Sequence, residues 1–257
     1  MKKKIIGMIH LLPLPGYPDH PGMAAVVKQA LKDLAVLETG GVNAVLVENE
    51  NDHPHQVKAG PEIISAMTIV VSEVVKKAKA PVGVEVLLND PQASLAIAKI
   101  TGAKFIRTDY FVDKMWRQKY GQIEIDPKKL IAYKHKIKAG SVKIFADVQV
   151  KYAKLLGKGK TISQSVKQAI KAGADAVIVT GKVSGEAPQL KDLKEAKQAA
   201  GKFPVYVGSG FSFNNAKKLL PFCDGAIVGT SIKQNGIPSK QKTKILTKYV
   251  YKLTGEI

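Results

Sequence analysis

The chain has 257 residues, 45% of them hydrophobic, and its 40 basic and 21 acidic residues give a formal net charge of +19. All but two of the basic residues, Arg107 and Arg117, are lysines scattered along the chain. This argues against specific nucleic-acid recognition, which relies on bidentate arginine contacts to bases and phosphates. The single cysteine, Cys223, excludes an intramolecular disulfide.

The N-terminal segment has three lysines followed by an apolar run, a pattern that signal peptides share. His10, Pro13 and Pro15 interrupt the run, and no small-residue cleavage site follows it. No stretch of the chain approaches the roughly 20 apolar residues of a membrane span. We therefore expect a cytoplasmic protein without a transmembrane segment.

Short β-branched runs alternate with helical stretches along the whole chain. We predict eight strands, at Lys4–His10, Asn43–Glu48, Pro81–Val86, Lys104–Asp109, Val142–Asp147, Asp175–Thr180, Pro204–Gly208 and Gly225–Gly229. The predicted helices are Met23–Glu38, Pro61–Lys79, Pro91–Lys99, Pro127–Ala139, Ser163–Ala172, Gln189–Ala199, Ser212–Leu220 and Lys240–Lys252. The strands are nearly continuous apolar runs, as in parallel strands buried on both faces. Eight such units without a linker predict one α/β domain over residues 1–257, a (β/α)8 TIM barrel, rather than an open doubly wound sheet.

In such a barrel the functional residues lie at the carboxyl ends of the strands. Glu48, Asp109 and Asp147 close the second, fourth and fifth predicted strands. Buried carboxylates need a partner, a cation or a ligand, so these three are candidates for acid–base catalysis or for holding a divalent metal such as Mg²⁺ or Zn²⁺. Arg107 shares a side of its strand with Asp109, and it serves either the ligand or a structural ion pair with Glu48 or Asp147.

Histidines and one asparagine also lie near strand ends. His10 ends the first strand and is either an acid–base group, a ligand contact or a structural histidine. His53 and His55 have the spacing to share a metal, but no third histidine or cysteine completes the site, so we expect an exposed loop. Asn89 precedes Asp-Pro and is expected to cap the next helix. Lys151 follows the fifth strand, but one lysine among so many is uninformative.

A long segment after the fourth predicted strand contains the aromatic residues Tyr110, Trp116 and Tyr120. Loops of this length at the carboxyl end of a barrel are either lids over the site or packed connections. The sequence leaves both interpretations open.

The last two predicted strands both end in glycine turns. Their backbone amides would point at one spot and can hold a phosphate dianion. Glycine lets a ligand approach the backbone, and neighbouring hydroxyls add donors. We therefore predict a phosphate-binding corner, with two tight turns as the alternative interpretation. The corner consists of Gly208, Ser209, Gly210, Gly229, Thr230 and Ser231.

The opening motif Ile6–Gly16 resembles that of the BtpA/SgcQ family. The likeness continues in order through Val47–Asn49, Asn89–Pro91, Phe105–Arg107, Ala146–Val148 with Lys151, Val179–Gly181, Val207–Gly210 and Ala226–Lys233. The resemblance implies a TIM-like barrel, in a family named after a member needed for photosystem I biogenesis. The chain departs from the family pattern at His53–His55, Glu85, Thr108–Tyr110 and Tyr152, which belong to the expected active face.

The sequence therefore predicts an enzyme that binds a phosphorylated small molecule, a sugar- or nucleotide-type phosphate, at the carboxyl end of the barrel. An isomerase, a phosphorylase and a lyase all fit the candidate residues. The alternative function is that of a non-catalytic biogenesis or assembly factor that uses the barrel as a scaffold. A homo-oligomer is compatible with a barrel of this size.

Overall fold

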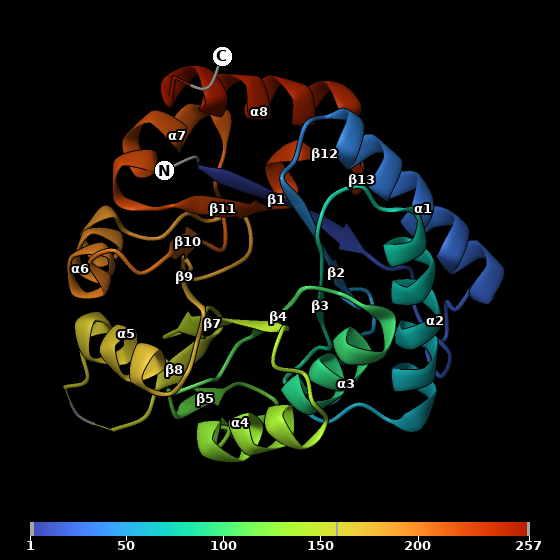
Figure 1. The fold of residues 1–257 in the computed structure, drawn as a ribbon, viewed down its shortest axis with the longest axis horizontal. Coiled ribbons are helices and arrows are strands. Elements are labelled where there is room, and N and C mark those ends of the chain that lie inside the picture. Colours follow the sequence, from blue (N-terminus) through green and yellow to red (C-terminus); the bar gives the residue numbers. More distant parts are fainter. Residues whose placement is uncertain (1–2, 158, 256–257) are drawn as a thin grey trace.

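A closed barrel of eight parallel strands forms the centre of the computed structural model, which describes residues 3–157 and 159–255 (Figure 1). The strands are β1 (Lys4–His10), β2 (Ala44–Glu48), β3 (Val82–Glu85), β4 (Phe105–Thr108), β7 (Lys143–Val148), β9 (Ala176–Val179), β10 (Val205–Val207) and β11 (Gly225–Val228). Each strand pairs with its neighbours in chain order, and β11 closes the barrel against β1. The predicted TIM barrel is confirmed, and every predicted strand end lies within one residue of the observed end.

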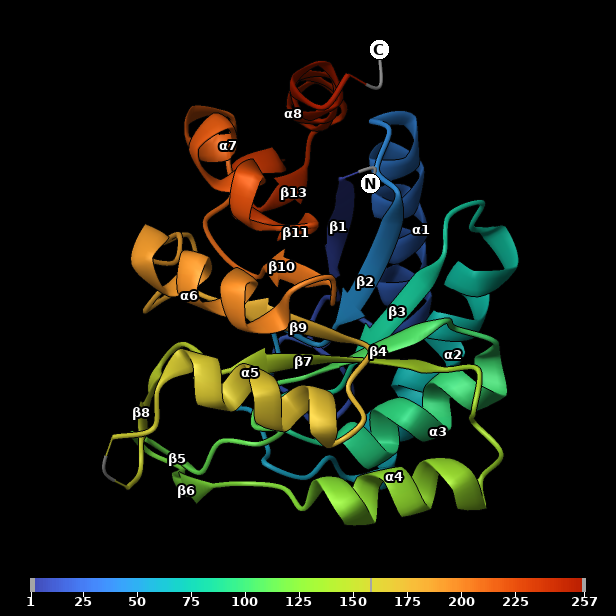
Figure 2. The ribbon, with the colours of Figure 1, turned by 60° about the vertical axis from the view of Figure 1, so that its left-hand side comes forward.

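Eight α-helices of the described residues surround the barrel (Figures 1 and 2). They are α1 (Met23–Thr39), α2 (Pro61–Lys77), α3 (Pro91–Thr101), α4 (Pro127–Lys136), α5 (Ile162–Lys171), α6 (Leu190–Ala200), α7 (Phe213–Leu219) and α8 (Lys240–Leu253). Proline at the first position presets the helical φ of α2, α3 and α4 without losing a hydrogen bond. The side chain that caps α3 is that of Asp90, which accepts from Ala93 N, so the prediction that Asn89 is the cap is wrong. None of these helices is both long and apolar enough to cross a membrane.

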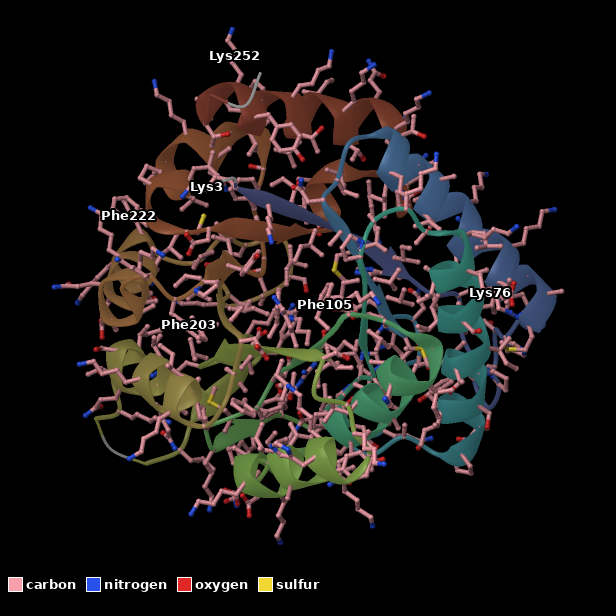
Figure 3. All side chains as sticks on the ribbon, in the orientation of Figure 1. Lys3, Lys76, Phe105, Phe203, Phe222 and Lys252 are labelled. Atoms are coloured by element: carbon pink, nitrogen blue, oxygen red, sulfur yellow. The ribbon has the colours of Figure 1, made fainter. Side chains whose placement is uncertain are left out.

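Two hydrophobic layers fix the barrel. An inner cluster fills it from alternate strand positions, and a larger outer cluster lies between strands and helices. Phe105 lies in the inner cluster, stacked on Phe145 with ring centroids 4.8 Å apart, near the centre of Figure 3. Gly83 makes room for it, since a Cβ on Gly83 would lie 2.2 Å from the Phe105 ring. Lysines such as Lys76 and Lys252 point outward from the helices (Figure 3), as expected for a solvated surface.

Additional short elements follow β4, β7 and β11. A three-stranded sheet consists of β5 (Met115–Arg117), β6 (Gly121–Ile123) and β8 (Ala153–Leu155), side by side in Figure 2. Tyr110 and Met115 are buried in a small cluster under this sheet, so the segment after β4 is a packed connection rather than a separate flap. The 3-10 helices η1 (Leu220–Phe222) and η2 (Thr230–Ile232) and the hairpin of β12 (Lys233–Gln234) and β13 (Ile237–Pro238) complete the chain.

Candidate active site

A polar layer lies on the inner hydrophobic cluster at the carboxyl end of the barrel. Because alternate residues of a strand point to the same face, the residue two positions after an inner hydrophobic residue also points inward. These positions hold His10, Glu48, Arg107, Asp147, Thr180, Gly208 and Gly229. The layer thus has large polar or charged side chains on the side of β1 to β7. On the side of β9 to β11 it has only a threonine and two glycines, which leaves room for a ligand.

Arg107 is at the centre of this layer and is only 4% exposed. Its Nε and Nη2 donate to the two carboxylate oxygens of Asp147, at 2.9 Å each. Its Nη1 lies 3.2 Å from Glu48 Oε1 and 3.6 Å from Glu85 Oε2, and Nη2 lies 4.0 Å from Asp109 Oδ1. Both structural ion pairs left open by the sequence are therefore present. One guanidinium cannot neutralise four carboxylates, so the charge of Lys151 and protons on the carboxyl groups supply the remaining compensation.

Glu48 and Glu85 are adjacent in register on β2 and β3. Burial, together with the charge of Glu48, raises the pKa of Glu85 well above its usual value, although Arg107 acts against this rise. Burial also acts to raise the pKa of Glu48, but the hydrogen bond from Glu85 and the charge of Arg107 lower it to about 2. The opposite shifts favour a proton on Glu85 over one on Glu48, and a protonated Glu85 donates to the ionised Glu48.

Asp109 follows β4 and is 7% exposed. Burial and the charge of Asp147 raise the pKa of Asp109 to about 6, while Arg107 lowers it by less. A carboxyl group with this pKa exists in both protonation states near neutral pH, which is what a general acid or base requires. The two aspartates therefore differ in environment, because both oxygens of Asp147 accept from Arg107, whereas Asp109 Oδ1 lies 4.0 Å from Arg107 Nη2 and its pKa is raised by burial.

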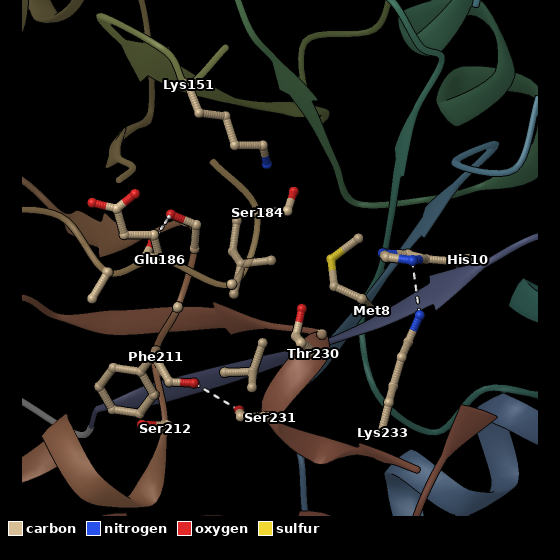
Figure 4. A pocket seen from close by; sticks show the side chains of 18 of the residues that line it. Met8, His10, Lys151, Ser184, Glu186, Phe211, Ser212, Thr230, Ser231 and Lys233 are labelled. Carbon is tan, nitrogen blue, oxygen red and sulfur yellow. Dashed lines mark hydrogen bonds between the residues drawn. The ribbon is translucent and has the colours of Figure 1, made fainter. Parts of the chain in front are cut away.

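His10 contacts Lys233, a residue that the sequence did not single out. Lys233 Nζ lies 2.8 Å from His10 Nδ1 (Figure 4). An ammonium group only donates, so Nδ1 accepts and His10 holds its proton on Nε2, which lies 3.8 Å from Glu48 Oε2. Burial lowers the pKa of His10 to about 4, against the opposing effect of Glu48. His10 is therefore neutral at pH 7 and can donate its Nε2–H to a ligand.

The two glycine turns lie side by side, but their residues have different tasks. Gly210 has φ of +62°, and a Cβ there would lie 2.1 Å from Ala187 N, so backbone packing already requires this glycine. Ser209 Oγ donates to Glu186 O at 2.7 Å, and Ser231 Oγ donates to Phe211 O at 2.7 Å. Both hydroxyl hydrogens are thus used within the protein.

The free donors of the corner come from Thr230 and from backbone. The N–H groups of Thr230 and Ser231 open η2 and have no acceptor within that helix. The Thr230 hydroxyl points into the cavity in Figure 4. The phosphate-binding corner stays a prediction, and these groups are the ones that would hold the phosphate.

Ser209 is instead predicted to anchor the loop between β9 and α6. Its Oγ also accepts from Gly181 N at 2.7 Å, so one hydroxyl joins the loop at two points. The Ser209→Ala variant is expected to lower the free energy of unfolding by about 2 kcal/mol, because it leaves a donor and an acceptor unpaired. Urea denaturation of the variant and the wild type measures this loss. An unchanged unfolding midpoint would show that water replaces both bonds.

A cavity of about 870 Å³ joins the glycine turns to the charged layer. His10, Glu48 and Arg107 line one side, and Gly208–Phe211 and Gly229–Ser231 line the other. Lys151 reaches into the space between them, with its Nζ pointing to the cavity in Figure 4. A smaller cavity of about 160 Å³ continues over Glu85 and Asp109. The predicted site residues thus line these two adjoining cavities, except Asp147, which is fully buried beneath them on Arg107.

Sequence reasoning placed Glu85 and Lys151 near the active face without giving them a role, and it did not single out Lys233. Lys151 lies in a loop whose flanking residues Gln149 and Tyr152 have φ of 46° and 63°, values that residues other than glycine rarely adopt. Strain of this kind is typical of functional sites. The signal for Glu85 was in the sequence, since its strand period places it beside Glu48, whereas the two lysines could not be distinguished from the other lysines.

The histidines after β2 differ from the expectation. His55 is buried, with Nδ1 hydrogen-bonded to Asp52 O, and its ring stacks on that of His53 at 4.7 Å. The expectation of an exposed loop is therefore wrong for His55. Across residues 3–157 and 159–255, no three His, Cys, Asp or Glu side chains are grouped so that they could hold a metal ion. The barrel carboxylates surround Arg107 instead.

Comparisons with known proteins place this architecture among relatives. The model of the BtpA family matches residues 1–252. The chain is 38% identical to the photosystem I biogenesis protein BtpA of Synechocystis sp. over 90% of this chain and 81% of that protein. It is 31% identical to the putative sgc region protein SgcQ of Escherichia coli, over 92% and 88%. Among solved structures, N-(5'-phosphoribosyl)anthranilate isomerase from Pyrococcus furiosus superposes with a TM-score of 0.59 over 100% of both chains at 13% identity, a similarity of fold.

Proposed function

The chain belongs to the BtpA family, and from this premise we propose that it is a cytoplasmic enzyme that acts on a phosphorylated small molecule. The observation that supports the proposal most is the cavity of about 870 Å³, which connects the glycine turns to the charged layer. Environment shifts the pKa values of ionisable groups in this layer in opposite directions, upward for Asp109 and downward for Glu48. The superposed isomerase, whose name contains a phosphoribosyl group, agrees with a ligand of this class. The phosphate would bind between the turns of β10 and β11.

The charged layer fits proton transfer. Asp109 would take or return a proton, while His10 would donate from Nε2 to a developing oxyanion. Arg107 and Lys151 would balance the negative charge of the substrate and of the carboxylates. Of the three reaction classes that the sequence left open, isomerisation and lyase chemistry need such proton transfers most directly.

Thermal stability in the presence of phosphate compounds tests this function. We expect inorganic phosphate and ribose 5-phosphate to raise the Tm, because a ligand that binds only the folded state stabilises it by mass action. Thr230→Asp should abolish the rise by placing a negative charge at an exposed position of the corner. Thr230→Val, which removes the hydroxyl but adds no charge and leaves the backbone N–H groups in place, should keep a reduced rise.

The same measurement is repeated with Mg²⁺ and Zn²⁺ to reveal a metal requirement. If no phosphate compound raises the Tm under any condition, the corner is only a pair of turns and the proposed function is wrong.

A second candidate function is that of a non-catalytic biogenesis factor. It is favoured by the similarity to the Synechocystis relative, which is named a photosystem I biogenesis protein. A scaffold does not need an exchangeable proton, so an Asp109→Asn variant would keep its cellular role. An enzyme would lose that role in the same variant while the barrel remained folded.

A further inference from the structure

A second large cavity lies beside the candidate active site and has no role in the function proposed above. Its volume is about 580 Å³. One wall is formed by Trp116 of β5 and by residues 149–154, which lead into β8, and the other is formed by the loop after β9 and the start of α6. Trp116 and Tyr152 line it, and their exposed fractions are 42% and 44%.

The register of β5 and β8 explains why this wall is aromatic. Trp116 pairs with Lys154, while Met115 pairs with Leu155. Paired residues share a face of a sheet, so Trp116 and Lys154 point into the cavity and Met115 points into the buried cluster beneath. The large indole ring of Trp116 therefore faces the cavity, whereas the side chain of its neighbour Met115 is the one that packs into the buried cluster.

Tyr152 is held in a fixed orientation at the edge of the same cavity. Its hydroxyl accepts from Ser184 N at 2.8 Å, and the guanidinium of Arg117 lies 5.2 Å from the centre of its ring. Its φ of 63° is uncommon for an aromatic residue. Three independent constraints therefore fix a ring that remains 44% exposed, and this describes a prepared contact surface rather than a loose side chain.

The second cavity borders the first. Lys151, Glu186 and Ala187 line both. A molecule with its phosphate between the glycine turns can therefore extend past Lys151 to the aromatic wall. Gln118 and Gln189 also line the second cavity, and a glutamine amide can offer both donors and an acceptor to the edge of a ring.

We propose that the second cavity binds a planar heteroaromatic ring, so that the substrate is of the nucleotide type, a phosphorylated sugar attached to a base. This rests on the proposed function, because it takes the phosphate of the same molecule to lie in the first cavity. Aromatic side chains bind bases by stacking on their faces, and two exposed rings without a ligand would be left in contact with water. A simple sugar phosphate would leave this cavity unfilled.

Fluorescence provides a direct test, since Trp116 is the only tryptophan of the chain. AMP, UMP and ribose 5-phosphate are titrated into the protein, with excitation at the red edge of tryptophan absorption. We expect the nucleotides to quench Trp116 and to bind about tenfold more tightly than ribose 5-phosphate, in line with the strength of base stacking. Trp116→Ala should remove this preference in thermal-shift titrations, whereas Trp116→Phe should retain most of it.

Phe213→Ala is the matched control. Phe213 is 48% exposed but packs against the tilted ring of Tyr249 outside both cavities, so its loss should not affect the preference for nucleotides. Equal binding of ribose 5-phosphate and nucleotides, with unchanged fluorescence, would overturn the inference and leave the proposed function in place. Failure of every phosphate compound to bind would overturn both.

Discussion

Replacing Arg107 by methionine is expected to lower the free energy of unfolding by about 4 kcal/mol at pH 7, the largest stability effect of a single substitution that we predict. The guanidinium is 4% exposed and contacts Asp147, Glu48, Glu85 and Asp109. Methionine would preserve the packing of the alkyl chain but leave these carboxylates without their cation. Chemical denaturation followed by circular dichroism measures the loss.

Arg117→Met is the matched control, because Arg117 is the only other arginine and contacts the rings of Tyr120 and Tyr152 from a less buried position. It should lose less than about 1 kcal/mol, the typical value for a partly exposed cation–π contact. The deficit of Arg107→Met should also shrink as the pH falls, since protonation removes the charge of the unpaired carboxylates. An equal loss for both variants would mean that Arg107 contributes mainly by packing.

The barrel could be predicted from the sequence because its signals are local. Continuous apolar runs such as Ala176–Val179 identify parallel strands, and prolines such as Pro91 mark the first turn of a helix. The cap of α3 could not be predicted because Asn89 and Asp90 are both good caps. Only the backbone geometry shows that Asp90 reaches the first turn.

The site could be predicted only in part. Alternation along a strand places Glu48, Arg107 and Asp147 inside the barrel, and the fold then brings them together. Which carboxyl group is protonated depends on distances that no pattern in the sequence encodes. The Glu85 proton follows from the adjacency of Glu48 and from burial, both properties of the folded chain. The two serines of the glycine turns illustrate the same limit, since their backbone partners come from other loops.

The Asp109→Asn variant is expected to be more stable than the wild type at pH 8, by about 3 kcal/mol, and to lose the proposed activity by about 100-fold or more. The pKa of Asp109 is about 6 in the folded protein, against 3.8 in a model peptide. Between these values the folded state keeps a proton that the unfolded state releases. Stability therefore falls as the pH rises from about 4 to 6, and the full cost remains above pH 6.

Asparagine has no such proton, so the curves of stability against pH for variant and wild type should separate between pH 4 and pH 6 and then run parallel. Asp113→Asn is the control, because Asp113 is equally buried but accepts from Ser165 Oγ at 2.7 Å and Gln149 N at 2.8 Å and pairs with Lys160. That variant should lose stability at pH 8.

A gain of stability in Asp109→Asn would mean that the Asp109 carboxyl group lowers the free energy of unfolding of the wild type. A destabilising group of this kind is expected where a proton-transferring residue is retained for function. If Asp109→Asn is instead the less stable protein at pH 8, attraction to Arg107 outweighs burial, and Asp109 is a structural partner like Asp147.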